Sequence, residues 1–131
     1  MSILNKIASV LAFVIGAMAI FAGGRVLLGN DPGYYVINWL PLYNYTMGIL
    51  TLFITATLIW MNGRFAMPAA IGTFGLHAIV MLILQTAYSG VVASDSIQAM
   101  TLRLVVWVII LGLMVAQARS IAKNRKKDMI G

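Results

Sequence analysis

The sequence lacks cysteine and glutamate, and it carries little charge of either sign. Its 131 residues include one histidine and three acids, namely Asp31, Asp95 and Asp128. Without cysteine, thiol–disulfide exchange is excluded. Without glutamate, a di-iron site built on Glu-x-x-His motifs is excluded as well. Phosphate-binding loops and glycine-rich dinucleotide fingerprints are also missing from the sequence. These absences remove most enzyme chemistry, and we expect no catalytic residue.

Hydrophobic residues make up 62 % of the chain and charged residues 9 %, whereas soluble domains average about 45–50 % and about 25 %. Residues 7–24, 32–63 and 65–94 contain no Asp, Glu, Lys or Arg. At about 1.5 Å per helical residue, each run is long enough to cross about 30 Å of hydrocarbon. A lipid bilayer is therefore the expected solvent, and a water-soluble enzyme is excluded.

Breaks in the hydrophobic pattern predict four membrane-spanning helices, at about residues 7–28, 43–61, 67–88 and 97–118. Glycine and proline mark the breaks, and Asp95 or Ser96 is expected to cap the fourth helix. Connections of a few residues make sequential helices run antiparallel. The predicted fold is an all-α integral membrane protein in which four transmembrane helices form an up-down antiparallel bundle. Residues 1–131 are expected to form a single transmembrane domain.

Basic residues are sorted between the two sides of this predicted bundle. Seven of the nine fall on the side of the termini: Lys6, Arg64, Arg119, Lys123, Arg125, Lys126 and Lys127. Because positive charge marks the cytoplasmic side, both termini are predicted to be cytoplasmic, in a bacterial or archaeal cytoplasmic membrane. The basic tail, residues 119–131, directly follows a membrane helix. We therefore expect it to meet anionic lipid headgroups and not nucleic acid.

Small residues form one continuous stripe along the first predicted helix, at spacings of three and four. They are Ser9, Ala12, Gly16, Ala19 and Gly23. Such a stripe allows close backbone approach between membrane helices. Two interpretations follow: the stripe packs against another helix of the same bundle, or it forms the seam of a homodimer.

The connection at residues 29–42 and the turn after it are rich in aromatic rings: Tyr34, Tyr35, Trp39, Tyr43 and Tyr45. Tyrosine and tryptophan gather at headgroup depth, because their rings are apolar and one edge seeks a hydrogen bond. The spacing of four also allows a short interfacial helix over 36–40, whose rings would cover the bundle. The cluster is therefore either an aromatic belt or part of a ligand platform.

His77 lies near the middle of the third predicted helix, where an ionisable group is a functional candidate because its burial is costly. It shares a predicted stripe with Thr73, Met81, Gln85 and Tyr88. The second helix offers Thr51 and Thr55 as hydrogen-bond partners. One interpretation is a neutral, hydrogen-bonded histidine with a structural role. The other is a histidine that carries a proton or binds a ligand.

Arg103 lies about two turns into the fourth predicted helix and keeps its charge. It must therefore reach the outer headgroups, a water-filled cavity or an acidic partner. Trp107 lies one turn deeper, where its ring could stack on the guanidinium. We formulate the hypothesis of an outward-facing polar vestibule with His77 at its floor. Its ligand-binding residues would be His77, Arg103, Arg25, Gln85, Tyr88, Trp39 and Trp107.

Three functions remain compatible with these residues. The first is a small non-catalytic membrane protein that acts as a subunit or accessory of a membrane assembly, or as a homo-oligomer. The second is a binding or transport protein for a small polar or anionic ligand at the vestibule. The third is a haem- or pigment-binding protein, with His77 as the metal or pigment ligand. For the first two functions no cofactor is predicted, and the expected partners are lipid and other membrane subunits or a second copy.

Overall fold

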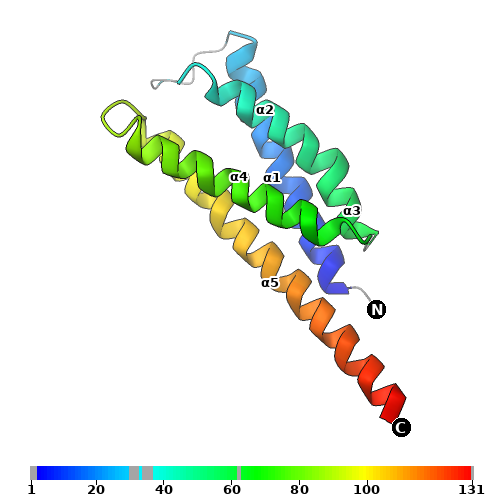
Figure 1. Cartoon of the computed structure of the whole chain (residues 1–131). Coiled ribbons are helices and arrows are strands. Elements are labelled where there is room, and N and C mark those ends of the chain that lie inside the picture. Colours follow the sequence, from blue (N-terminus) through cyan, green and yellow to red (C-terminus); the bar gives the residue numbers. More distant parts are fainter. Residues whose placement is uncertain (1–2, 30–32, 34–36, 62, 131) are drawn as a thin grey trace.

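The computed structural model describes residues 3–29, 33, 37–61 and 63–130, and all of its regular elements are helices. In chain order they are α1 (Ile3–Leu27), α2 (Leu40–Leu50), a π-helical segment η1 (Thr51–Thr55), α3 (Ala56–Trp60), α4 (Ala66–Thr86) and α5 (Ser94–Ile130). The segments α2, η1 and α3 follow one another without a break. The described part of the chain therefore contains four long helical rods (Figure 1).

All four rods are long and apolar enough to cross a membrane: Ile3–Leu27, Leu40–Trp60, Ala66–Thr86 and Ser94–Asn124. At the level of helix length and composition, this confirms the predicted all-α, multi-pass integral membrane protein. The bounds differ from the predicted spans at the helix ends: α1 begins at Ile3, α2 begins at Leu40, and α5 continues to Ile130. Asp31, Tyr34, Tyr35 and Val36 lie outside the described residues. Of the interfacial helix predicted over 36–40, residues 37–39 are not helical and Leu40 is the first residue of α2.

Residues suited to helix ends stand where α1 ends and α2 begins, whereas the predicted capping position of the fourth helix is wrong. Pro41 stands in the first turn of α2, where its missing N–H costs no hydrogen bond. α1 is followed by Gly29, whose φ of 94° favours glycine. α5 begins at Ser94, so the predicted capping residues Asp95 and Ser96 lie inside its first turn. There the Asp95 carboxylate faces the positive end of the helix dipole.

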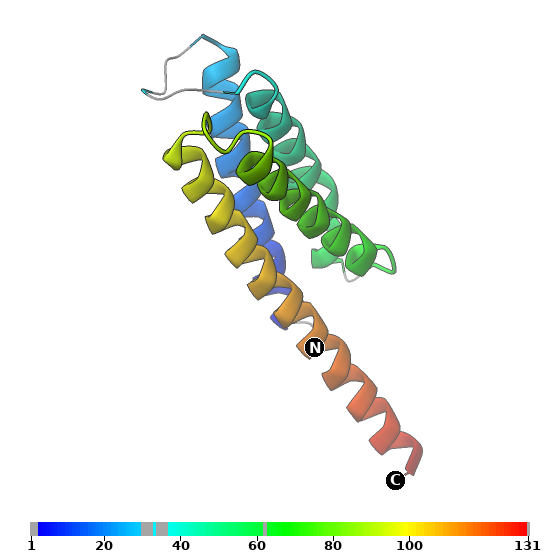
Figure 2. The same cartoon turned by 60° about the vertical axis from the view of Figure 1, so that its left-hand side comes forward.

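The rods lie side by side and leave two distinct ends, which the views in Figures 1 and 2 agree on. At one end, called the Tyr88 end, α1 finishes, α2 begins and α4 passes into α5. At the other, called the Arg64 end, α1 begins and α3 passes into α4. A hydrogen bond from the Leu4 N–H to the Gln117 side chain, at 3.1 Å, places Gln117 of α5 level with the start of α1.

The small-residue stripe of α1 is buried against α2 and η1 of the same chain. A Cβ atom added to Gly48 would lie 2.7 Å from both the Gly16 oxygen and the Ile20 nitrogen. One added to Gly23 would lie 2.5 Å from the Pro41 oxygen. The two backbones are therefore in direct contact, and only glycine permits this approach.

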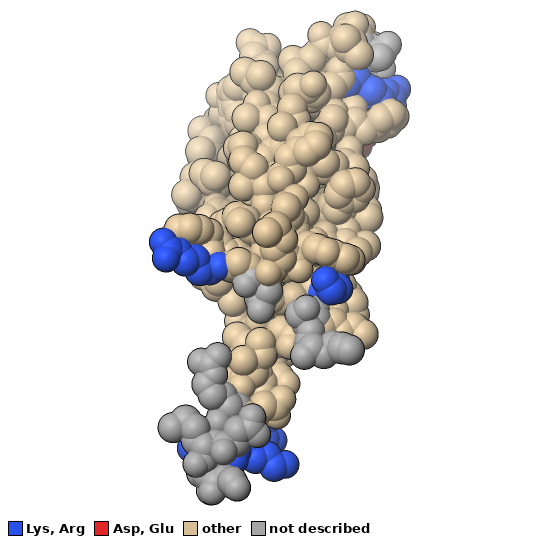
Figure 3. Space-filling model, turned by 90° about the vertical axis from the view of Figure 1, so that its right-hand side faces the viewer, with Lys and Arg blue, Asp and Glu red and all other residues tan. Residues whose placement is uncertain are grey.

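α5 is 37 residues long, or about 55 Å, and it continues past the bundle at the Arg64 end (Figure 2). The predicted tail thus begins as a continuation of the fourth helix. Its exposed basic side chains are here called the basic extension: Arg119, Lys123, Lys126 and Lys127. On the face shown in Figure 3, Lys and Arg lie near the ends of the bundle and on this extension, and no charged side chain is visible in the middle of the bundle.

Candidate functional site

The buried face of α4 carries the single histidine of the chain. His77 is 2 % exposed and shares this face with Thr73, Val80 and Leu84. The Thr73 hydroxyl donates to the Ala69 carbonyl at 2.8 Å, so it is satisfied within its own helix. His77 therefore needs a partner from a neighbouring helix, since a buried polar group without a hydrogen bond is costly.

That partner is Tyr43 in the first turn of α2. The Tyr43 hydroxyl lies 2.8 Å from Nδ1 of His77, and the two rings meet edge to face with centroids 5.8 Å apart. Either tautomer of the imidazole satisfies this contact, because a hydroxyl can donate or accept. The pair joins α2 to α4 inside the bundle.

Trp39 and Tyr88 continue this aromatic cluster toward the Tyr88 end. The Trp39 indole Nε1–H donates to the Tyr88 hydroxyl at 3.0 Å, and the Trp39 ring packs edge-on against both Tyr43 and Tyr88. The four side chains Trp39, Tyr43, His77 and Tyr88 are here called the aromatic column. Two hydrogen bonds within the column, Tyr43 with His77 and Trp39 with Tyr88, pair polar edges of these rings with each other.

Arg103 of α5 turns inward beside this column. It is 6 % exposed, and its Nη1 donates to the Asn44 side-chain oxygen at 2.5 Å. Asn44 directly follows Tyr43 in α2, so the guanidinium lies near the Tyr43–His77 pair. A permanent positive charge thus lies inside the bundle, where it needs polar partners because burial of a charge is costly.

Of the predicted vestibule residues, His77, Arg103, Tyr88 and Trp39 are brought together around Tyr43 and Asn44. Trp107 is fully buried among Ile110 and Met114, and its Nε1 has no hydrogen-bond partner in the described part of the chain. The predicted stacking of Trp107 on Arg103 stays a prediction.

Two predicted vestibule residues lie elsewhere. Gln85 is on the exposed side of α4, because eight residues at about 100° each leave it about 80° away from His77. Arg25 is exposed on α1, where its guanidinium lies 5.3 Å from the Phe21 ring centroid. Gln85 and Arg25 are therefore not part of the cluster around His77, in contrast to the predicted vestibule.

Sequence reasoning named Thr51 and Thr55 as partners of His77 and missed Tyr43. Both threonines are buried, but the hydrogen bond comes from Tyr43, nearer the Tyr88 end. The available signal was Pro41, which fixes the first turn of α2 and so places Tyr43 and Asn44 on the helix and not in the loop.

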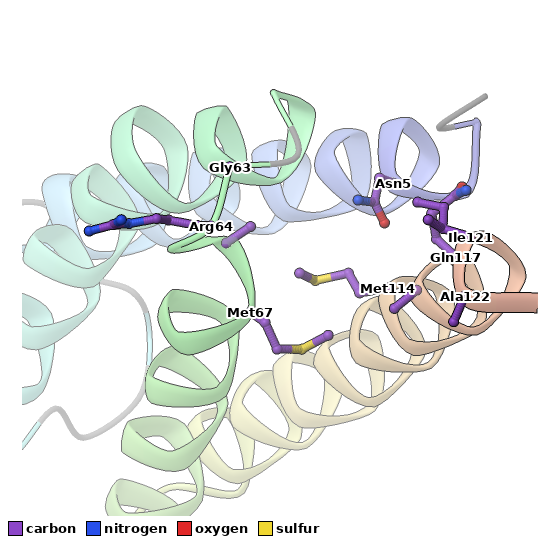
Figure 4. A pocket seen from close by; sticks show the side chains of 10 residues that line it. Asn5, Gly63, Arg64, Met67, Met114, Gln117, Ile121 and Ala122 are labelled. Carbon is purple, nitrogen blue, oxygen red and sulfur yellow. The ribbon is translucent and has the colours of Figure 1, made fainter. Parts of the chain in front are cut away.

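A separate cavity of about 290 Å³ lies at the Arg64 end, between α1, α4 and α5. Figure 4 shows the Met67 and Met114 side chains pointing into it, with Asn5 and Gln117 beside them and Arg64 directed away. The Gln117 oxygen already accepts the Leu4 N–H. Flexible thioethers and amides therefore line this cavity, and the charged side chain of its lining, Arg64, is directed away from it.

Comparisons with protein-family models, with curated proteins and with solved structures gave no match to this chain. Among the described residues, no three His, Cys, Asp or Glu side chains are grouped closely enough to hold a metal ion.

Proposed function

We propose that this protein is a non-catalytic subunit of a membrane assembly and that α5 binds its partner. The observation that carries the proposal is a face of α5 that no other part of the described chain covers. Gly112, Ala116 and Ser120 are exposed and four residues apart, and a Cβ added to Gly112 would meet no atom within 4 Å. These three residues are here called the outward face of α5. Small residues in this pattern permit close approach of another membrane helix.

The basic extension continues the outward face beyond the bundle. Arg119 and Lys123 follow Gly112 by seven and eleven residues, so they lie within about 20° of the same direction. Lys127 lies about 15 Å beyond Gln117 along the helix axis. A partner helix on the outward face would therefore meet positive charge where it leaves the bilayer.

The charge of the extension favours a different protein over a second copy. Two copies that met through this face would bring their basic extensions together, and like charges at an interface repel. The chain offers little compensation, since its only acids are Asp31, Asp95 and Asp128. We therefore propose a partner with one transmembrane helix on the outward face and acidic residues just outside the membrane.

The arrangement in the membrane belongs to the same proposal. The excess of Lys and Arg at the Arg64 end supports an orientation with both termini in the cytoplasm, and the short connections between helices support an up-down antiparallel bundle. In this orientation the basic extension is cytoplasmic. Arg119 and Lys123 then lie at headgroup depth, where they would also attract anionic lipids.

The interior of the bundle supports a structural role for its polar residues. Hydrogen bonds join α2 to α4 through Tyr43 and His77, and α2 to α5 through Asn44 and Arg103. Such contacts between membrane helices contribute about 0.6 kcal/mol each on average. They would fix the position of α5 and hence the direction of its outward face.

The experiment is native gel electrophoresis of membranes solubilised in mild detergent. The wild-type protein should migrate in a complex larger than its own monomer and contain a second polypeptide. Replacing Lys123, Lys126 and Lys127 by glutamine should release the monomer. The matched control is Arg64→Gln, which removes an exposed cytoplasmic charge away from α5 and should leave the complex intact. A wild-type protein that runs as a monomer would contradict the proposal.

A second candidate function is the binding or transport of a small anion near Arg103. It is favoured by one observation, the inward guanidinium beside the Tyr43–His77 pair. The test is chloride flux into liposomes that contain the purified protein. Flux that Arg103→Gln abolishes and Arg25→Gln preserves would favour this function, because Arg25 lies away from the column.

Haem or pigment binding at His77 remains the third prediction. The structure adds that Nδ1 of His77 is engaged with Tyr43, which leaves Nε2 as the nitrogen for a ligand bond. An absorbance spectrum of the purified protein tests this prediction, and a protein-bound band in the visible region would favour it.

A further inference from the structure

A groove of about 410 Å³ runs along the lipid-facing side of α1, η1 and α3. Its floor is formed by the buried residues Ser9 and Ala56, and the Ser9 hydroxyl donates to the Ala56 carbonyl at 2.6 Å. Phe13 and Phe53 stand beside it as exposed walls. Because the polar groups of the floor are paired, the groove offers an apolar channel between two aromatic walls.

A cation stands at one end of this groove. Trp60 lines the groove, and the ammonium nitrogen of Lys6 lies 3.9 Å from the centroid of the Trp60 ring. Lys6 lies one turn before Ser9 in α1, at the Arg64 end, whereas Phe13 lies about 10 Å deeper along the helix. The groove therefore passes from a positive charge at headgroup depth to apolar walls at acyl-chain depth.

We propose that this groove is a binding site for one anionic phospholipid. Its phosphate pairs with the Lys6 ammonium, and one acyl chain lies between Phe13 and Phe53 over the floor of Ser9 and Ala56. The positive charge at one end of the groove and the apolar channel beyond it lie in the same order as the anionic headgroup and the acyl chain of a phospholipid. A helix of a partner or of a second copy is about 10 Å wide, and the two phenylalanine walls obstruct its close approach to the floor.

The site is independent of the outward face of α5, because its residues belong to α1, η1 and α3. Lys6 is held against Trp60 by a cation–π contact, which keeps the ammonium at the mouth of the groove. One Lys near an anionic surface supplies a preference of about fivefold in binding. That factor sets the size of the expected effect.

The test uses Trp60 as a reporter in liposomes of defined composition. Brominated acyl chains quench a nearby indole, and the Trp60 contribution is the difference between the wild type and Trp60→Phe. One sample carries brominated phosphatidylglycerol among unlabelled phosphatidylcholine, and the other carries brominated phosphatidylcholine among unlabelled phosphatidylglycerol, at the same bromine content. Phosphatidylglycerol should occupy the site about five times more readily.

Variants separate the site from general lipid contact. Lys6→Gln should abolish the preference, whereas Lys6→Arg and the control Arg64→Gln should keep it. Thr57→Phe, which fills the exposed side of the groove, should reduce quenching by both lipids. Circular dichroism of each variant verifies its helical fold. Equal quenching by the two lipids in the wild type, or a preference that survives in Lys6→Gln, would overturn the proposal.

Discussion

The contact between α1 and α2 leads to a sharp stability prediction for Gly48. A Cβ atom at this position would lie 2.7 Å from two backbone atoms of α1, the Gly16 oxygen and the Ile20 nitrogen. Ordinary van der Waals contact begins at 3.4 Å, and neither backbone atom can move aside as a side chain could. In Gly48→Ala the two helices must therefore separate by about 0.7 Å at this point.

Such a separation weakens the contacts on either side of it. A gap of that size forfeits about a quarter to a half of the dispersion energy of each affected atom pair. Overpacking of this kind costs about 1–3 kcal/mol, and the higher helix propensity of alanine returns at most about 1 kcal/mol. We expect Gly48→Ala to lower the free energy of unfolding by about 1–2 kcal/mol.

The assay is unfolding by sodium dodecyl sulfate in mixed micelles, followed by circular dichroism. Gly72→Ala is the matched control, because Gly72 is exposed in α4 and its added Cβ would meet no atom within 4 Å. It should leave stability unchanged or raise it by up to about 1 kcal/mol. The reasoning is refuted if Gly48→Ala is as stable as the wild type, or if Gly72→Ala loses as much stability.

Two further predictions concern the aromatic column and the orientation in the membrane. Tyr43→Phe removes the hydrogen bond to His77 and should lower the free energy of unfolding by about 0.5–1.5 kcal/mol in the same titration, whereas Tyr45→Phe, at an exposed ring, should change it little. Equal losses in the two variants would contradict the pairing. Because the chain has no cysteine, Gly90→Cys and Asn124→Cys give labelling without background from other thiols of the chain. A membrane-impermeant thiol reagent added outside should label position 90 in intact cells and position 124 only after permeabilisation, and the reverse pattern would contradict cytoplasmic termini.

The sequence was sufficient to predict the four membrane-spanning helices, because uncharged runs, prolines and glycines act locally. It did not predict the length of α5, since the charged residues after Ala118 were interpreted as a tail. They are strong helix formers, and the chain contains no glycine or proline between Gly112 and Gly131 to end the helix.

Contacts between helices were harder to predict, because they depend on how each helix is rotated and tilted against its neighbours. The residue pattern of one helix does not indicate this arrangement. The predicted stripe from His77 to Gln85 assumed steps of four, which drift around a helix of 3.6 residues per turn. The aromatic-rich segment predicts an interfacial position for Tyr43, yet its ring lies against His77. Which of the buried polar groups on α2 faces the histidine depends on how α2 and α4 lie against each other.

The most direct test of the proposed function is photo-crosslinking in intact membranes from single positions on α5 and α4. A photoreactive amino acid at Ala116 reports on the outward face, and one at Ile79 reports on a lipid-exposed position of α4. We predict a covalent adduct with a second, different polypeptide from position 116 and none from position 79. The adduct should disappear when Lys123, Lys126 and Lys127 are glutamine. Lipid adducts alone at position 116, or a dimer of this chain, would contradict the proposed partner.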